Sequence, residues 1–359
     1  MTERVLTRRE LNRALLARQL LLERTPASVS KAVERLGGLQ AQYSPSPYLS
    51  LHARLDGFER AQLTSALEKR QVVKALLQRG TLHIVTPRDF WAFTAARRAL
   101  AADYWPPAYE KLLPKRRIAE IASATVTELH SGPLTFEEVR ALLRPYATER
   151  ISTTFLWRRV QGQVPVVHVP PSGTWGYHGD GVFVAAGAVL RGGLPDPEDA
   201  RDHLIRSYLR AFGPASANDV AQWAGLQRTG PITETLAAMS LRTFRDERGK
   251  VLYDLPRAPL PDAETPAPPR LVPRYDNLVL SHADRTRILG DVPVARIVTK
   301  NALVHATILV DGFAAGTWQL EKGRVRLEPF SRVARETAAS LRLEAERVEG
   351  FVDGSEAPS

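Results

Sequence analysis

Two glutamines, Gln40 and Gln42, stand two residues apart between the glycine pair 37–38 and a proline-bounded turn. A glutamine amide has no group that titrates near neutral pH, so it cannot abstract a proton as an aspartate or a glutamate would. Its oxygen accepts hydrogen bonds and its NH2 group donates them, so its chemical use is to orient a water or a ligand. Amides are costly to bury without partners, and by composition alone both residues belong to a loop.

Several other chemistries lack the residues that they need. The chain has no cysteine, which excludes disulfides, thiol nucleophiles, iron–sulfur clusters and cysteine-containing zinc sites. Its eight histidines form no His-x-His or His-x-x-x-His pair. The sequence also has no phosphate-binding loop, no Gly-x-Gly-x-x-Gly and no Gly-x-Ser-x-Gly motif. We therefore expect neither a metal site nor a cofactor.

The composition bounds the architecture and the partner. A length of 359 residues predicts about two to three domains, and 44% hydrophobic with 25% charged residues is typical of a folded protein. The net charge of +10 favours a polyanionic partner such as nucleic acid or anionic lipid. The alternative is that the excess of arginine only forms a solvated surface. Because the sequence has neither a membrane span nor a signal peptide, we expect a cytoplasmic protein that does not bind membranes.

One helix-start motif occurs twice. Segment 132–139 reads Gly-Pro-Leu-Thr-Phe-Glu-Glu-Val, and segment 213–220, 81 residues later (213 minus 132), reads Gly-Pro-Ala-Ser-Ala-Asn-Asp-Val. In both, a hydroxyl residue and an acidic residue three positions later form a capping box, and a second helix and a β-hairpin follow. Helices within 7–36 and a hairpin over 72–85 make a degenerate first copy. We predict three tandem winged helices in an α+β fold; the alternative is chance reuse of a Gly-Pro helix start.

The repeat also sets the expected domain boundaries. Residues 1–115 form the first winged-helix unit, which carries the two glutamines, residues 116–195 the second, and residues 196–256 the third. Seven prolines among the eighteen residues 256–273 predict an extended connector. Alternating strands over 303–327 predict an antiparallel β-rich element, and a closing helix is expected from Ser331 to about Val348. Residues 257–359 thus combine the connector, the β-rich element and the C-terminal helix.

Several tracts carry a resemblance to a known family. Gly-Gly-Leu-Gln-Ala-Gln at 37–42, Tyr-Leu-Ser-Leu-His-Ala-Arg-Leu at 48–55 and Arg-Gly-Thr-Leu-His at 79–83, with segments 271–287 and 310–318, resemble the AlkZ/YcaQ family of bacterial DNA glycosylases. The resemblance spans roughly residues 5 to 345. It implies three tandem winged helices and a C-terminal β-rich element in a C-shaped scaffold that embraces DNA, in agreement with the repeat count. It also implies excision of alkylated bases through a signature of Gln, an apolar residue, and Gln or Asp, which Gln40 and Gln42 match in the Gln-Gln form of the AlkZ branch.

Under this resemblance, the two glutamines are catalytic residues that position a water against C1′ of the damaged nucleotide. Positioning alone suffices only where the leaving base is already activated, as in N7-alkylguanine or N3-alkyladenine, whose positive charge weakens the glycosidic bond. The expected substrates are these cationic alkylated purines, extending to bulky adducts and interstrand crosslinks. Because Lys31 lies a helix away from the glutamines, we expect a monofunctional glycosylase without Schiff-base chemistry.

The expected partner is double-stranded DNA, bound by a monomer. Cations on the winged units are expected to hold backbone phosphates, and the C-terminal tract to line the DNA channel, unless its arginines simply pair with neighbouring carboxylates. The expected DNA-binding residues are Arg54, Arg79, Arg158, Arg159, Arg274, Asn277, His282, Arg285 and Arg287. Two other functions stay open: a non-catalytic winged-helix DNA-binding protein such as a transcriptional regulator, and an RNA-binding scaffold.

Overall fold

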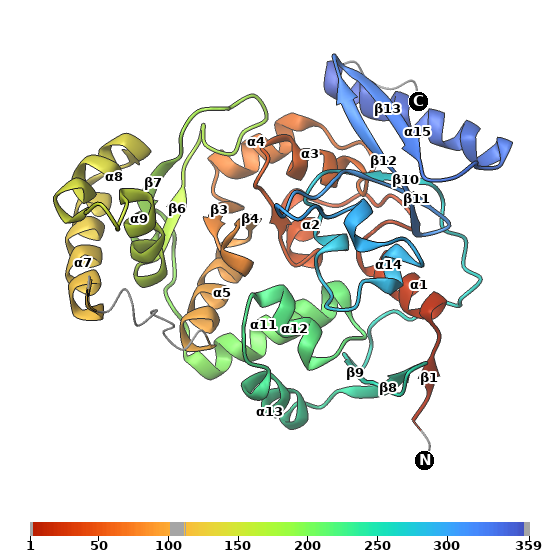
Figure 1. The fold of residues 1–359 in the computed structure, drawn as a ribbon, viewed down its shortest axis with the longest axis horizontal. Helices are drawn as coiled ribbons and strands as arrows, with labels where there is room; N and C mark the ends of the chain where they lie inside the picture. The colour runs from red at the N-terminus through yellow and green to blue at the C-terminus, as the bar shows by residue number, and fades with distance from the viewer. Residues whose placement is uncertain (1–2, 101–110, 112, 355–359) are drawn as a thin grey trace.

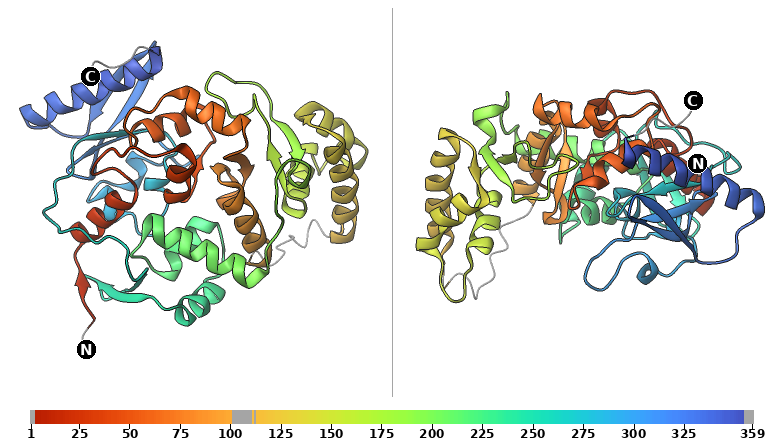
Figure 2. Two further views of the ribbon diagram at one scale, coloured as in Figure 1. Left: turned by 180° about the vertical axis from the view of Figure 1, so that it is seen from behind. Right: turned by 90° about the horizontal axis from the view of Figure 1, so that it is seen from above.

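A computed structural model describes residues 3–100, 111 and 113–354 as an α+β fold (Figure 1). Three sheets occur within these residues: six strands in the order β2-β4-β3-β6-β7-β5, four in the order β10-β11-β12-β13, and three in the order β1-β8-β9. Helices surround the sheets, and the views in Figure 2 place the helices of residues 115–163 together at one side of the molecule. The predicted fold class is confirmed.

The N-terminal part supplies the strand that carries Gln40. Its helix α1 starts with the predicted capping box, in which Thr7 and Glu10 bond each other's backbone N–H groups. The elements are β1 (Val5–Leu6), α1 (Arg8–Arg18), α2 (Val29–Arg35), β2 (Leu39–Gln40), α3 (Pro45–His52), α4 (Arg60–Glu68), β3 (Val73–Leu76), the 3-10 turn η1 (Gln78–Gly80), β4 (Leu82–Val85) and α5 (Pro87–Leu100). The predicted hairpin is confirmed as the antiparallel pair β3–β4.

The second part extends the same sheet. Its elements are α7 (Lys115–Ser131), β5 (Leu134–Thr135), α8 (Phe136–Leu143), η2 (Arg144–Tyr146), α9 (Thr153–Gln163), β6 (Val166–His168), β7 (Val182–Ala185) and α10 (Ala186–Val189). Thr135 and Glu138 form the predicted capping box, and β6 pairs with β7 as the predicted hairpin. Lys74 of β3 pairs with His168 of β6, so the two hairpins belong to one sheet.

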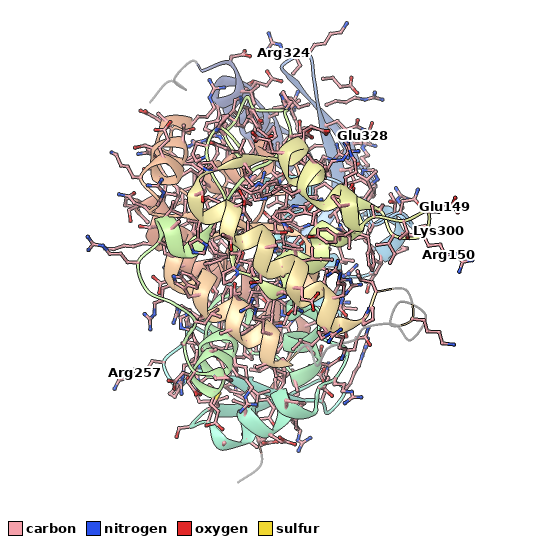
Figure 3. The ribbon with its side chains drawn as sticks, turned by 90° about the vertical axis from the view of Figure 1, so that its left-hand side faces the viewer. Glu149, Arg150, Arg257, Lys300, Arg324 and Glu328 are labelled. Atoms are coloured by element: carbon pink, nitrogen blue, oxygen red, sulfur yellow. The ribbon has the colours of Figure 1, made fainter. Side chains whose placement is uncertain are left out.

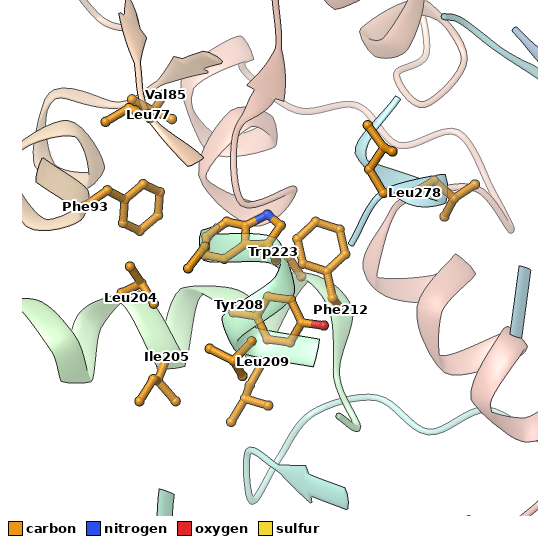
Figure 4. Packing of buried hydrophobic residues seen from close by; sticks show 14 of the residues in the cluster. Leu77, Val85, Phe93, Leu204, Ile205, Tyr208, Leu209, Phe212, Trp223 and Leu278 are labelled. Atoms are coloured by element: carbon orange, nitrogen blue, oxygen red, sulfur yellow. The ribbon is translucent and has the colours of Figure 1, made fainter. Parts of the chain in front are cut away.

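The third part packs its helices into the main core. Its elements are α11 (Pro197–Phe212), α12 (Ala217–Ala224), α13 (Gly230–Ala238), β8 (Arg242–Asp246) and β9 (Val251–Asp254). Ser216 and Asp219 form the predicted capping box, and β8–β9 is the predicted hairpin. Trp223 is fully buried and meets Phe93 edge-on at 5.6 Å between ring centroids (Figure 4). Helices from the first and third parts therefore share one core.

The C-terminal part contains the β-rich element and differs from expectation at two places. Its elements are β10 (Arg270–Val272), η3 (Asn277–Val279), α14 (Thr286–Leu289), η4 (Val294–Arg296), β11 (Thr307–Val310), β12 (Phe313–Glu321), β13 (Arg324–Pro329) and α15 (Arg335–Asp353). The predicted proline-rich connector ends in strand β10, because Leu271 and Val272 are buried against β11. The closing helix begins at Arg335, after the N-cap Ala334, rather than at Ser331.

Charged side chains project outwards around the molecule, as Arg150, Arg257 and Arg324 do in Figure 3. Other arginines bridge parts that are distant in sequence. Arg18 of α1 makes a bidentate ion pair with Asp254 of β9 at 2.7 and 2.9 Å, and both side chains are buried. The division into three winged-helix units stays a prediction, and the contacts show that the first and third segments are held together by buried charge as well as by apolar packing.

Candidate active site

Gln40 lies on the edge strand of the six-stranded sheet, not in a loop as its composition indicates. Strand β2 runs antiparallel to β4, with Gln40 opposite His83. Gly37 and Gly38 precede it with φ of +71° and +90°, in the left-handed region that favours glycine. A Cβ atom on Gly38 would lie 2.8 Å from Cγ1 of Val85. The glycine pair therefore lets the chain pass close to β4 and brings Gln40 into register.

The amide of Gln40 is bonded to an arginine from the adjacent hairpin turn. Gln40 is 6% exposed, and its Oε1 accepts a hydrogen bond of 2.8 Å from Nη2 of Arg79. Nη2 also donates to Oδ1 of Asn277 at 3.1 Å, and Nη1 donates to the carbonyl oxygen of Trp223 at 2.9 Å. Asn277 in turn donates from Nδ2 to the carbonyl oxygen of Gly38 at 3.0 Å. The structure thus brings together Gln40, Arg79 and Asn277 from segments far apart in sequence.

His83 completes the surroundings of the Arg79 guanidinium. It is fully buried, and its Nδ1 lies 3.1 Å from the carbonyl oxygen of Thr81, so Nδ1 carries the proton and Nε2 faces Nη2 of Arg79 at 3.5 Å. Burial and the charge of Arg79 lower the pKa of His83 to about 3, so it is neutral at pH 7. Burial and the charge of Arg285 lower the pKa of Arg79 to about 10, and Arg79 remains a cation. This cation is therefore held by neutral acceptors.

Gln42 is exposed at the end of the same strand edge. The pairing continues past Gln40, since the N–H of Ala41 donates to the carbonyl oxygen of Leu82 at 2.7 Å. Strand β2 itself ends at Gln40, and Gln42 follows it in a bend of the chain. Oε1 of Gln42 accepts a long hydrogen bond of 3.3 Å from the N–H of Leu82. Gln42 is thus much less constrained than Gln40.

A small cavity lies beside Gln40. Its volume is about 10 Å³, and its lining includes Gln40, Ser46, Ser50, Asp276 and Asn277. A space of this size holds about one water molecule. It is far too small for an extruded nucleobase, which base-flipping enzymes take into a fitted pocket.

Four residues expected to bind DNA lie in the interior instead, and we correct their assignment. One is Asn277, which is 5% exposed and bonds Arg79 and Gly38 as described above. Arg54 is 1% exposed and pairs with the Asp276 carboxylate at 2.8 and 2.9 Å. His282 is 1% exposed, with Nε2 3.0 Å from the carbonyl oxygen of Phe212. Arg287 is 6% exposed and donates to a backbone carbonyl at 2.8 Å. Because these side chains are buried and bond to groups inside the protein, we assign them to the fold and not to the DNA interface.

The other expected DNA-binding residues divide by location. Arg274 is exposed beside the site, with its guanidinium 5.7 Å from the ring centroid of Tyr43, and Arg285 is partly exposed near Arg79. Arg158 and Arg159 lie on α9 in the separate group of helices at the side of the molecule, so the structure does not bring them to Gln40. The sequence does not reveal that Arg79 and Asn277 hold Gln40, because no local pattern indicates a contact between the hairpin turn, the edge strand and the C-terminal segment.

The described residues offer neither a cluster of metal ligands nor an apolar helix long enough to span a membrane. Within residues 3–100, 111 and 113–354, no group of three or more His, Asp or Glu side chains is placed to hold a metal ion. The same residues include no helix with the length and apolar character needed to cross a membrane.

Comparison with known proteins identifies the family. The family model for AlkZ-like DNA glycosylases matches residues 33–351. A curated relative from Streptomyces sahachiroi, named interstrand DNA cross-link repair glycosylase, is 22% identical over 360 aligned residues, which cover 92% of each chain. The solved structure of the DNA glycosylase AlkZ from the same organism matches with a TM-score of 0.82 and 20% identity, covering 98% of each chain. The chain therefore belongs to the AlkZ-like family of DNA glycosylases, enzymes that hydrolyse N-glycosyl bonds.

Proposed function

We propose that this glycosylase removes cationic alkylated purines, of the N7-alkylguanine or N3-alkyladenine type, by attack of a water that Gln40 and Gln42 position. The observation that carries the proposal is the setting of the two amides on one strand edge. Among the residues that the structure describes, no carboxylate hydrogen-bonds to either glutamine. With no general base in contact, the site acts by positioning, and positioning suffices for a leaving base that already carries positive charge.

The reaction that follows is a hydrolysis without a covalent enzyme intermediate. The water oxygen bonds to C1′, the C1′–N bond breaks, and its electron pair neutralises the departing base while the water proton passes to solvent. Lys74 lies on β3, which β4 separates from the strand of Gln40. It pairs with Ile84, one register position from His83, so its side chain faces the opposite side of the sheet from Gln40. This placement supports a monofunctional enzyme that leaves the DNA strand intact.

The size of the cavity bears on the lesions that the enzyme accepts. Because the space beside Gln40 holds about one water, we propose that the enzyme acts on the lesion without drawing the base into an enclosed pocket. Bulky adducts and interstrand crosslinks then become possible substrates, since a base tied to the other strand cannot be extruded. The name of the Streptomyces relative, a cross-link repair glycosylase, supports this extension.

DNA binding is proposed to rest on phosphate contacts by a monomer that works in the cytoplasm. Winged-helix units would place their cations along the backbone of one duplex, and a scaffold that surrounds DNA needs no symmetric partner. The proposed contacts that the structure leaves at least partly exposed are Arg79, Arg158, Arg159, Arg274 and Arg285. Asn277 is 5% exposed and is proposed to act through Arg79.

The test uses duplex DNA with one site-specific N7-methylguanine, followed by alkaline cleavage of abasic sites. The wild-type protein is expected to release the base without breaking the strand before alkali is added. The Gln40→Ala, Gln42→Ala double variant is expected to bind the duplex and release no base. Full release by the double variant would disprove the role of the glutamines. Absence of an abasic product from both methyl and bulky adducts would favour the non-catalytic DNA-binding protein.

A further inference from the structure

We infer that Arg79 is a positioning residue that determines which end of the Gln40 amide faces the DNA. Under this inference, Gln40 works through its NH2 group, as a hydrogen-bond donor to an oxygen of the bound nucleotide, and Gln42 orients the attacking water through its oxygen. The inference rests on the proposed function and assigns a different role to each of the two glutamines.

The first step concerns the chemistry of the partner. An arginine guanidinium has only donors, whereas a glutamine amide has one accepting end and one donating end. Nη2 of Arg79 lies 2.8 Å from Oε1 of Gln40. Rotating the amide by half a turn would place an NH2 group against donor N–H groups, which is a repulsive contact. The oxygen of Gln40 therefore stays on Arg79, and its NH2 group points away.

The second step is that Arg79 is itself held. Nη1 donates to a backbone carbonyl oxygen, that of Trp223, and a carbonyl oxygen can only accept. Asn277 offers its oxygen to Nη2 because its own NH2 group is bound to the carbonyl oxygen of Gly38. Gly38 lies two residues before Gln40, so the network returns to the strand where it began. Each of these contacts joins a donor to an acceptor, and turning either amide would place an NH2 group against a donor of Arg79.

The third step concerns the atoms left for a ligand. Among the described residues, Nε2 of Gln40 has no hydrogen-bond partner, and it is not one of the fully enclosed polar atoms. Gln42 is exposed and accepts only the long bond from Leu82. A carbonyl oxygen has two lone pairs, so Oε1 of Gln42 can accept from a water as well. The pair therefore presents a fixed donor at Gln40 and an adaptable acceptor at Gln42.

A matched pair of glutamate substitutions separates the two roles. Glutamate keeps the shape and the accepting oxygens but loses the NH2 donor. In single-turnover assays on the N7-methylguanine duplex, Gln40→Glu is expected to lose about 100-fold in rate, which is the typical cost of one functional donor. Gln42→Glu is expected to stay within about 10-fold of the wild type, because a carboxylate also accepts from water. Urea unfolding confirms that both variants are folded.

The outcomes are distinct. Near-wild-type release by Gln40→Glu would show that the oxygen is the working atom and would overturn the inference. Equal loss in Gln40→Glu and Gln42→Glu would overturn the division of roles. A wild-type protein that releases no base would instead reject the proposed function, and the inference with it.

A second experiment tests Arg79 directly. Arg79→Met is expected to lower the single-turnover rate at saturating DNA by about 10-fold or more through misplacement of Gln40, with partial recovery in Arg79→Lys. In the double variant with Gln40→Glu, Arg79→Met is expected to lower the rate little further, because both substitutions remove the same function. Arg257→Met, on the exposed surface, is the control. Losses that multiply in the double variant, together with weaker DNA binding, would show that Arg79 only contacts phosphate and would overturn the inference.

Discussion

Arg54 offers the sharpest test of whether the buried arginines stabilise the fold and do not contact DNA. The predicted change is Arg54→Met. In the structure, its guanidinium donates to both carboxylate oxygens of Asp276, to the hydroxyl and carbonyl oxygens of Ser50 and to the carbonyl oxygen of Gln19, at 2.8 to 3.0 Å. Arg54 and Asp276 are 1% and 4% exposed. Methionine fills much of the volume and removes every donor, so the carboxylate is left buried without its cation.

The expected magnitude follows from this burial. Removing one member of a buried ion pair costs about 3–5 kcal/mol of unfolding free energy, which is a large share of the roughly 5–15 kcal/mol that stabilises a typical protein. Replacing both members by apolar groups removes the uncompensated charge, so Arg54→Met with Asp276→Leu is expected to recover most of the loss. Part of the loss should remain, because Asp276 also accepts from the N–H of Leu278 at the start of η3.

Two measurements check the reasoning. Urea unfolding gives the free energies of the wild type, the single variant and the double variant. The dependence of DNA affinity on salt gives the number of phosphate contacts, and one lost contact lowers the log–log slope by about 0.9. We expect a large loss of stability in Arg54→Met and an unchanged slope where the variant is folded. A loss of stability below about 1 kcal/mol together with a reduced slope would refute the interior assignment and restore Arg54 to the DNA interface.

Three further predictions follow from other parts of the structure. Burial lowers the pKa of His83 to about 3 and also lowers the pKa of His282. Below pH 6.5 the unfolded chain therefore binds protons that the folded chain does not bind, so between pH 6.5 and 3 the free energy of unfolding should fall by up to about 1.4 kcal/mol per pH unit for each of these histidines. A urea-unfolding profile that stays flat from pH 7 to 5 would contradict this prediction. Gly38→Ala should lower the free energy of unfolding by about 1–3 kcal/mol and slow base release, because the added Cβ would meet Val85. The control is Gly57→Ala, at a positive φ with no neighbouring atom in the way, which should lower the stability less and leave base release unchanged. Equal effects of the two substitutions would argue against the close approach of Gly38 to Val85. Arg158→Gln should lower the salt slope by about 0.9 without changing stability, and an unchanged slope would remove this exposed residue from the proposed DNA contacts.

Local features of the fold were accessible from the sequence. The capping boxes at Thr7, Thr135 and Ser216 are confirmed, because a cap depends on residues within one helical turn. The three hairpins are confirmed for the same reason, since their strands are close in sequence. Strand β2 was missed because its two residues pair with β4, more than forty positions later. A strand this short has no alternating pattern of its own.

The sequence by itself determined the α+β class, the starts of the three helices with capping boxes, the hairpins and the Gln-x-Gln tract within a chain of the AlkZ-like family. Only the tertiary structure decided which cations face solvent and which atom of Gln40 faces Arg79. Arg54 finds its carboxylate 222 residues away, and Arg79 finds Asn277 198 residues away. Caps and turns are short-range interactions that neighbouring residues specify, whereas ion pairs and amide orientations depend on which distant groups the fold brings within hydrogen-bond distance.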